Sequence, residues 1–312
     1  MYNFKSGQPV SVKTKIIFNK NISEKDNFKN LGNFIKKEMN VDKKMNVADE
    51  LFINASHELR TPLNVIYSAV QLIELYMNDD VENDSVDKIA SNVNLIKRNS
   101  LRLMKVINNL LDLHKLDAGL LNLHYSYANI VEVVENVVQN VSEKIIDNQL
   151  NIIFDTEIEE KYMMMDIEAI QRVLLNIMSN AVKFSKQEGE ILVNVTVKNK
   201  SVDISVADTG IGIDKNHLAK VFKKFSQMDK SFSRKTEGSG IGLKISESLI
   251  KAHGGSISVF SVINEGSNFI IKLPCNKTDN IYNLYNNKVI RFDNLKEMIN
   301  IEFSDVDRVN IN

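Results

Sequence analysis

Residues 52–66 read FINASHELRTPLNVI, and Pro62 lies inside an otherwise regular helical pattern. The pattern predicts one amphipathic helix that continues through the proline, although an internal proline costs a helix about 3 kcal/mol. In the alternative interpretation, Thr61 caps a new helix whose first residue is Pro62. The apolar positions that define the seam on both sides of the proline are Met45, Ala48, Phe52, Ala55, Leu59, Leu63, Ile66, Val70, Ile73 and Met77.

A second apolar seam follows the short polar stretch NDDVENDS at residues 78–85. Two long helices with a short connection predict an antiparallel hairpin, which ends near Gly119. Because a lone hairpin leaves a broad apolar seam open to water, we expect two copies to pair as a homodimer with a four-helix bundle. The positions of this second seam are Val86, Ile89, Val93, Ile96, Ser100, Leu103, Ile107, Leu110 and His114.

The whole chain has 312 residues, a formal net charge of -1 and a single cysteine, Cys275. Its length predicts about two domains, and its balanced charge excludes a general attraction to nucleic acid or anionic membranes. One cysteine excludes an intrachain disulfide and a CxxC metal site. The first residues lack the apolar core of a signal peptide, and no stretch of about 18 apolar residues is present to span a bilayer. We therefore expect a cytoplasmic protein.

From about residue 126 the pattern becomes α/β. It predicts a helix near 130–148, a strand at 150–155, a helix opened by Asp166, and strands at 191–197 and 201–208. Most of the 12 glycines lie in this half, gathered in loops, which indicates backbone close to a ligand. Residues 10–18 alternate like a strand, and the tail after Pro274 is expected to be either an amphipathic helix or disordered.

Three polar residues of the first predicted helix, His57, Glu58 and Thr61, form a candidate catalytic group. His57 lies about 200° around the helix from the seam positions Ala55 and Leu59, so it is expected to face solvent, with Thr61 one turn further along the same face. HELRT also matches half of the zinc-protease pattern HExxH. Thr61 stands where the second histidine ligand belongs, which excludes that zinc site.

Five motifs together resemble those of two-component sensor histidine kinases, in the order found in that family. HELRTP resembles the H-box, QRVLLNIMSNAVKFS the N-box, ADTGIGI the first glycine box, VFKKF the phenylalanine box and EGSGIGL the second glycine box. The resemblance covers about residues 45–275. It implies a dimerisation and histidine phosphotransfer hairpin at 45–119, followed by a GHKL-type two-layer α/β sandwich that binds ATP at 126–275. Residues 1–44 are interpreted as a sensor remnant or linker, and residues 276–312 as a tail of unknown role.

In the N-box, Asn176, Asn180 and Lys183 fall on one face of the predicted helix, with Arg172 one turn earlier and apolar residues on the opposite side. Amide oxygens ligate Mg2+, and amide and ammonium donors bind phosphate without adding negative charge. The resemblance implies that Asn176 is the metal ligand and that Asn180 and Lys183 contact ATP.

Asp208 ends a predicted strand and precedes Gly210 and Gly212. Turn chemistry alone explains an aspartate before glycines. The resemblance implies more: the Asp208 carboxylate accepts the exocyclic amine of adenine, which selects ATP over GTP, and the two glycines let the backbone lie against the base.

The second glycine box precedes a predicted helix, whose first N–H groups are suited to bind phosphates. Its positions are Gly238, Gly240, Gly242 and Leu243. The preceding stretch, SQMDKSFSRKTE, is too polar for a core and is predicted to be a mobile lid. Two cations of this lid are candidates for a contact with the γ-phosphate: Arg234 and Lys235.

The predicted function is autophosphorylation of His57 from Mg-ATP, with Glu58 as proton acceptor. The resemblance implies that the phosphoryl group then passes to an aspartate on a separate response regulator, and that Thr61 orients water for dephosphorylation of that regulator. Two alternatives stay open: a GHKL-type ATPase clamp, and a non-catalytic dimeric signalling adaptor. A clamp has no need for His57 and Glu58 on a hairpin, and an adaptor has no need for intact nucleotide motifs.

Overall fold

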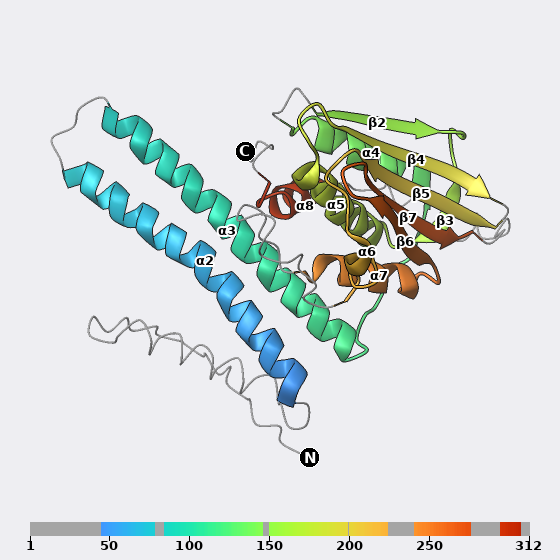
Figure 1. Cartoon of the computed structure of the whole chain (residues 1–312), viewed down its shortest axis with the longest axis horizontal. Helices are drawn as coiled ribbons and strands as arrows, with labels where there is room; N and C mark the ends of the chain where they lie inside the picture. Colours follow the sequence, from blue (N-terminus) through green and yellow to red (C-terminus); the bar gives the residue numbers. More distant parts are fainter. Residues whose placement is uncertain are drawn as a thin grey trace, which may run out of the picture. The chain divides into compact units, whose positions relative to one another are not determined.

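Two long helices open the described part of the chain in the computed structural model, which covers residues 45–78, 84–145, 150–198, 200–223, 240–275 and 294–306. Helix α2 (Met45–Asn78) contains Pro62 in its interior, so the prediction of a continuous helix is confirmed and the alternative start at Thr61 is wrong. Helix α3 (Asp84–Asp117) runs back along α2 (Figure 1). Next to their connection, Lys88 Nζ lies 5.8 Å from the centre of the Tyr76 ring.

Helix α3 ends just before Gly119, as the sequence predicts. Gly119 has a φ of 68°, and the N–H of Leu120 donates to the carbonyl oxygen of Lys115 at 2.8 Å. A left-handed glycine with this kind of backward hydrogen bond is a common way to end a helix. From Leu51 onward the described residues belong to one compact unit.

The α/β region contains a five-stranded sheet in the order β2-β4-β5-β7-β6, with β2 parallel to β4 and the other neighbours antiparallel. Its strands are β2 (Asn151–Thr156), β4 (Glu190–Lys198), β5 (Ser201–Asp208), β6 (Ser256–Val262) and β7 (Gly266–Pro274). A separate two-stranded sheet pairs β1 (Ser126–Asn129) with β3 (Tyr162–Met165), which the sequence pattern did not predict. The predicted strands β2, β4 and β5 are confirmed.

Three helices pack on this sheet, which gives the predicted two-layer sandwich after the helical hairpin (Figure 1). They are α4 (Ile130–Ser142), α5 (Ile167–Phe184) and α7 (Gly242–Ala252). Alternate residues of β4, including Ile191, Val193 and Val195, are fully buried against them. Asp166 caps α5 as predicted, because its side chain accepts the N–H of Ala169.

Two short helices complete the described elements, α6 (Lys215–Leu218) and α8 (Leu295–Glu302). Helix α8 shows that part of the tail is an amphipathic helix. The strand-like stretch at residues 10–18 lies outside the described residues. Within the described ranges, no helix has an apolar stretch long enough to cross a bilayer.

Candidate active site

His57 is exposed on α2, whereas the seam residues Ala55 and Leu59 are half-buried. This confirms that the histidine faces solvent. The Thr61 hydroxyl donates a hydrogen bond of 3.3 Å to the backbone carbonyl oxygen of His57, so the two residues lie one turn apart as predicted. Glu58 follows His57 directly and is half-buried.

Pro62 is buried within α2. It has no N–H to donate to the carbonyl oxygen of Glu58 four residues earlier. The turn that carries His57 therefore lacks one regular backbone hydrogen bond and gains one from a threonine hydroxyl. Both changes affect the helix at the predicted phosphoacceptor.

The N-box helix α5 packs with its apolar side, as predicted. The residues predicted to be buried are at most 4% exposed: Val173, Leu174, Ile177, Met178 and Ala181. Arg172, which the sequence pattern placed on the polar stripe, forms an ion pair with Asp112 of α3 and also donates to Asn109 Oδ1 at 3.4 Å. Arg172 therefore joins α5 to the hairpin.

The two N-box asparagines have different surroundings. Asn176 is 9% exposed, and its Nδ2 donates to the Ser246 hydroxyl of α7 at 2.8 Å. A Cβ added to Gly242 would lie 2.4 Å from Asn176 Oδ1, so this amide is held against the start of α7. Asn180 is half-buried, and the described residues provide no hydrogen bond to its side chain. The Asn180 amide is thus the more available of the two to a ligand.

Lys183, which lies near the end of the N-box helix, already has a charged partner. Its Nζ lies 2.9 Å from Asp305 Oδ2, and the two side chains are only 11% and 19% exposed. Asp305 belongs to the tail, for which the sequence indicated no role. In this structure the tail therefore provides the anionic partner of a predicted ATP contact.

Asp208 ends β5 with its carboxylate fixed by two backbone donors. Its Oδ1 accepts the N–H of Gly210 at 2.9 Å and the N–H of Ser267 at 3.3 Å. Burial raises the pKa of Asp208 above its usual value, although both N–H donors act in the opposite direction. Among the described residues, Oδ2 has no hydrogen-bond partner. This oxygen is the atom that remains to accept a donor from a ligand.

The first glycine box packs tightly against other backbone segments. Gly212 has a φ of 68°, and a Cβ added there would lie 2.0 Å from the carbonyl oxygen of Val262. A Cβ at Gly210 would lie 2.5 Å from the carbonyl oxygen of Phe184, at the end of α5. Both glycines are therefore required by contacts within the protein, in addition to any contact with a base.

We expect Gly212→Ala to reduce the free energy of unfolding by about 3 kcal/mol or more, because the backbone must move away from Val262. Gly119→Ala is a matched control, since Gly119 has the same φ of 68° but nothing within 4 Å of an added Cβ. Left-handed strain alone predicts a loss of about 1 kcal/mol for the control. Chemical unfolding measures both, and equal losses would contradict the packing argument.

Helix α7 begins at Gly242 without a side-chain cap. The N–H groups of a first helical turn have no partners within the helix, so they are suited to donate hydrogen bonds to an anionic ligand. Gly240 has a φ of 62°, and Leu243 packs against the core. Three predicted site residues lie outside the described residues: Arg234, Lys235 and Gly238.

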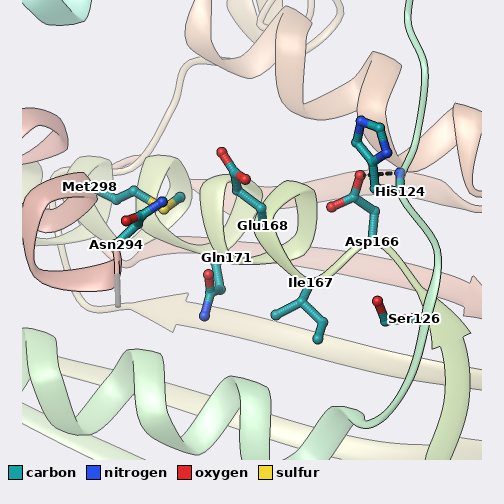
Figure 2. Close-up of a pocket in the computed structure, with 8 residues that line it drawn as sticks. All are labelled: His124, Ser126, Asp166, Ile167, Glu168, Gln171, Asn294 and Met298. Atoms are coloured by element: carbon teal, nitrogen blue, oxygen red, sulfur yellow. Dashed lines mark hydrogen bonds between the residues drawn. The ribbon is translucent and has the colours of Figure 1, made fainter. Parts of the chain in front are cut away.

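A cavity of about 200 Å³ lies at the N-terminal end of α5, and no predicted site residue lines it. Figure 2 shows the Asp166 carboxylate accepting the backbone N–H of His124, at 2.7 Å. His253 Nε2 in turn accepts the N–H of Asp166 at 3.1 Å. These bonds secure the ends of helices α5 and α7. The lining residues are His124, Ser126, Asp166, Ile167, Glu168, Gln171, Asn294 and Met298.

Residues far apart in the chain hold the predicted site residues in place, and the sequence pattern did not predict them. Ser246 holds Asn176, the N–H of Ser267 holds Asp208, and Asp305 pairs with Lys183. These partners are 70, 59 and 122 residues apart in the chain. No local pattern links residues at such separations.

Two families match the chain in sequence order. Residues 48–119 match the His Kinase A (phospho-acceptor) domain, and residues 165–277 match the histidine kinase-, DNA gyrase B-, and HSP90-like ATPase family. This chain belongs to the histidine kinase family. The first match in this histidine kinase contains His57, and the second contains Asn176, Asn180, Lys183 and Asp208.

The sensor histidine kinase TmoS of Ectopseudomonas mendocina is 32% identical to this histidine kinase over 80% of the chain and 25% of TmoS. The structure of full-length ShkA in complex with AMPPNP is 27% identical, with a TM-score of 0.53 over 70% of this chain and 44% of ShkA. The histidine kinase ThkA in complex with the response regulator protein TrrA has the same fold, with a TM-score of 0.55 at 19% identity over 82% of this chain and 68% of that chain. The chain spans between 16% and 27% of the length of three curated relatives, of which TmoS is one.

Proposed function

We propose that this chain catalyses ATP-dependent phosphorylation of His57. The observation that carries the proposal is an exposed histidine next to a carboxylate, His57 and Glu58, in a chain that also holds a fixed acceptor at Asp208. A free imidazole is largely neutral at neutral pH and is a good nucleophile. A cytoplasmic location, where ATP is supplied, is part of the proposal.

The proposed reaction is an in-line displacement at the γ-phosphorus of ATP. One ring nitrogen of His57 forms the new N–P bond, and the bond from phosphorus to the β–γ bridging oxygen breaks, so that ADP leaves with the electron pair. The proton of the other ring nitrogen passes to the Glu58 carboxylate. Such a positioned base typically contributes about 10²- to 10⁴-fold to the rate.

The nucleotide is assigned to the residues around α5, β5 and α7. Oδ2 of Asp208 accepts the adenine amine, and the N–H groups at the start of α7 bind phosphate oxygens. Bound Mg2+ would neutralise part of the negative charge on the phosphates. Asn176, with Nδ2 on Ser246, keeps Oδ1 as a ligand atom, and the available amide of Asn180 is the second candidate.

We also propose that the hairpin pairs with a second copy of the chain. Seam residues of both helices stay exposed in the single chain although their pattern predicts burial, and a continuous apolar stripe of this kind is typical of a helical interface. The exposed seam residues are Leu63 (41%), Val70 (39%), Met77 (69%), Val86 (60%), Val93 (50%) and Ile107 (47%). A homodimer with a four-helix bundle would cover them.

The phosphohistidine is proposed to transfer its phosphoryl group to an aspartate on a response regulator. An exposed His57 supports this step, because a separate protein must reach it. The position of Thr61 one turn away also supports a role in dephosphorylating the regulator.

Thr61→Ala is expected to slow dephosphorylation of the regulator by about 10²-fold or more, because the hydroxyl that orients water is lost. Autophosphorylation should continue, since His57 and Glu58 remain. The measurement follows loss of label from a receiver domain that the chain has itself phosphorylated. Thr61→Ser keeps the hydroxyl and should retain the wild-type rate. Equal rates in the alanine variant and the parent would exclude this role.

Incubation of the purified chain with γ-labelled Mg-ATP tests the proposed function directly. We expect protein-bound label that is acid-labile and base-stable, as is typical of an N–P bond. Binding and hydrolysis of ATP without such label would favour the ATPase clamp, and a failure to bind ATP would favour the adaptor.

A further inference from the structure

The C-terminal segment, defined here as residues 294–306, lies beyond the matched ATPase region at 165–277 and is docked on the protein core. Its apolar stripe follows helical spacing: Leu295, Ile299, Phe303 and Val306 are each at most 2% exposed and belong to the main hydrophobic cluster. Such burial indicates a specific docked position for the segment.

Helix α3 binds the polar end of the C-terminal segment. Arg98 and Arg102 both donate to the carbonyl oxygen of Ser304, at 3.2 and 3.0 Å. Arg98 also donates to the carbonyl oxygen of Val306 at 2.6 Å. Lys105 donates to the carbonyl oxygen of Glu302 at 2.6 Å. These cations are spaced at i, i+4 and i+7 on one face of α3. Lys105 binds the carbonyl group of the last residue of α8, and the two arginines bind carbonyl groups just beyond the helix.

The opposite side of the C-terminal segment contacts the N-box helix. The Ser179 hydroxyl donates to Glu302 Oε1 at 3.3 Å, and Lys183 pairs with Asp305 at 2.9 Å. Asp305 also lies 2.7 Å from Lys105 Nζ, so one carboxylate bridges α3 of the hairpin and α5 of the nucleotide domain.

The charges of this bridge are mutually stabilised. Burial alone would raise the pKa of Asp305, but Lys105 and Lys183 hold it well below its usual value. Burial alone would lower the pKa of Lys105, but the carboxylates of Asp305 and Glu302 raise it above its usual value. A bound triphosphate would therefore have to draw Lys183 away from a fully ionised carboxylate.

We propose that the C-terminal segment is an internal inhibitor of the nucleotide site: it occupies Lys183 through Asp305 and ties α5 to α3, and it must undock before Mg-ATP binds tightly. The inference rests on the proposed function, in which Lys183 contacts the phosphates. In the docked state Asp305 neutralises Lys183, so this cation is not available to attract a triphosphate. The fixed link between hairpin and nucleotide domain also opposes the approach of His57 to the γ-phosphate.

Full-length variants test this inference with two readouts, the Kd for Mg-ATP and the rate of acid-labile labelling. Asp305→Asn removes the charge that holds Lys183. The double variant Arg98→Ala/Arg102→Ala removes the arginine contacts of α3 to the segment without touching the nucleotide site. We expect both to bind Mg-ATP about 10-fold more tightly than the parent and to be labelled faster, a coupling of ordinary size for two linked sites. Glu297→Gln, on the exposed side of α8, is the matched control and should change neither value.

Unchanged or weaker Mg-ATP binding in both variants, with normal melting, would overturn the inference even if labelling proceeds. Tighter binding in both without any labelling would support competition by the C-terminal segment and contradict the proposed kinase function instead. Hydrogen exchange of residues 294–306 should become faster when saturating Mg-ATP is added to the parent. Protection that does not change on binding would also overturn the inference.

Discussion

His57→Gln is expected to remain unlabelled by γ-labelled Mg-ATP, whereas the parent chain becomes labelled. Glutamine has a similar size and polarity, but its amide nitrogen is not a nucleophile, so no N–P bond forms. Because His57 is exposed, the free energy of unfolding should change by no more than about 0.5 kcal/mol. Binding of Mg-ATP should be retained, which would show that the variant has lost the phosphorylation reaction and not the ability to bind ATP.

His114→Gln is the matched control for this experiment, because His114 is also an exposed histidine of the hairpin. It should be labelled like the parent. Residual label in His57→Gln, lost instead in His114→Gln, would show that the phosphoacceptor has been assigned to the wrong helix.

Asp208→Asn is expected to weaken Mg-ATP binding by about 10- to 100-fold. The new amide oxygen keeps the bonds to the N–H groups of Gly210 and Ser267, which places the amide nitrogen where Oδ2 now lies. A donor then faces the adenine amine, another donor. Hydrogen bonds to charged groups are worth about 1.5–3 kcal/mol, and each 1.4 kcal/mol is a factor of ten in Kd.

The same change should shift the preference toward GTP, because guanine presents a carbonyl acceptor at the equivalent ring position. Titration with ATP and GTP measures both effects. Asp203→Asn provides the control, since Asp203 lies on the same strand, 3.7 Å from Lys198, and has no predicted contact with the nucleotide. Retention of full ATP affinity in Asp208→Asn would show that residues other than Asp208 bind the adenine amine.

Much of the fold was predictable because its signals are local. The spacing of apolar residues on both sides of Pro62 predicted a continuous α2, and the placement of Gly119 predicted the end of α3. The same periodicity correctly divided α5 into a buried side and a polar side. In each case the information lies within a few turns of one helix, where side-chain direction follows directly from position in the sequence.

The partners of the site residues depended on the folded chain. The polar stripe of α5 alone did not predict that Arg172 would pair with Asp112, that Asn176 would be held by Ser246, or that Lys183 would meet Asp305. An exposed-looking cation can pair with any of many carboxylates, and periodicity does not choose among them. The choice is made when α3, α5 and α8 pack together, because burial of the apolar side of α8 brings Asp305 against Lys183 across 122 residues of chain.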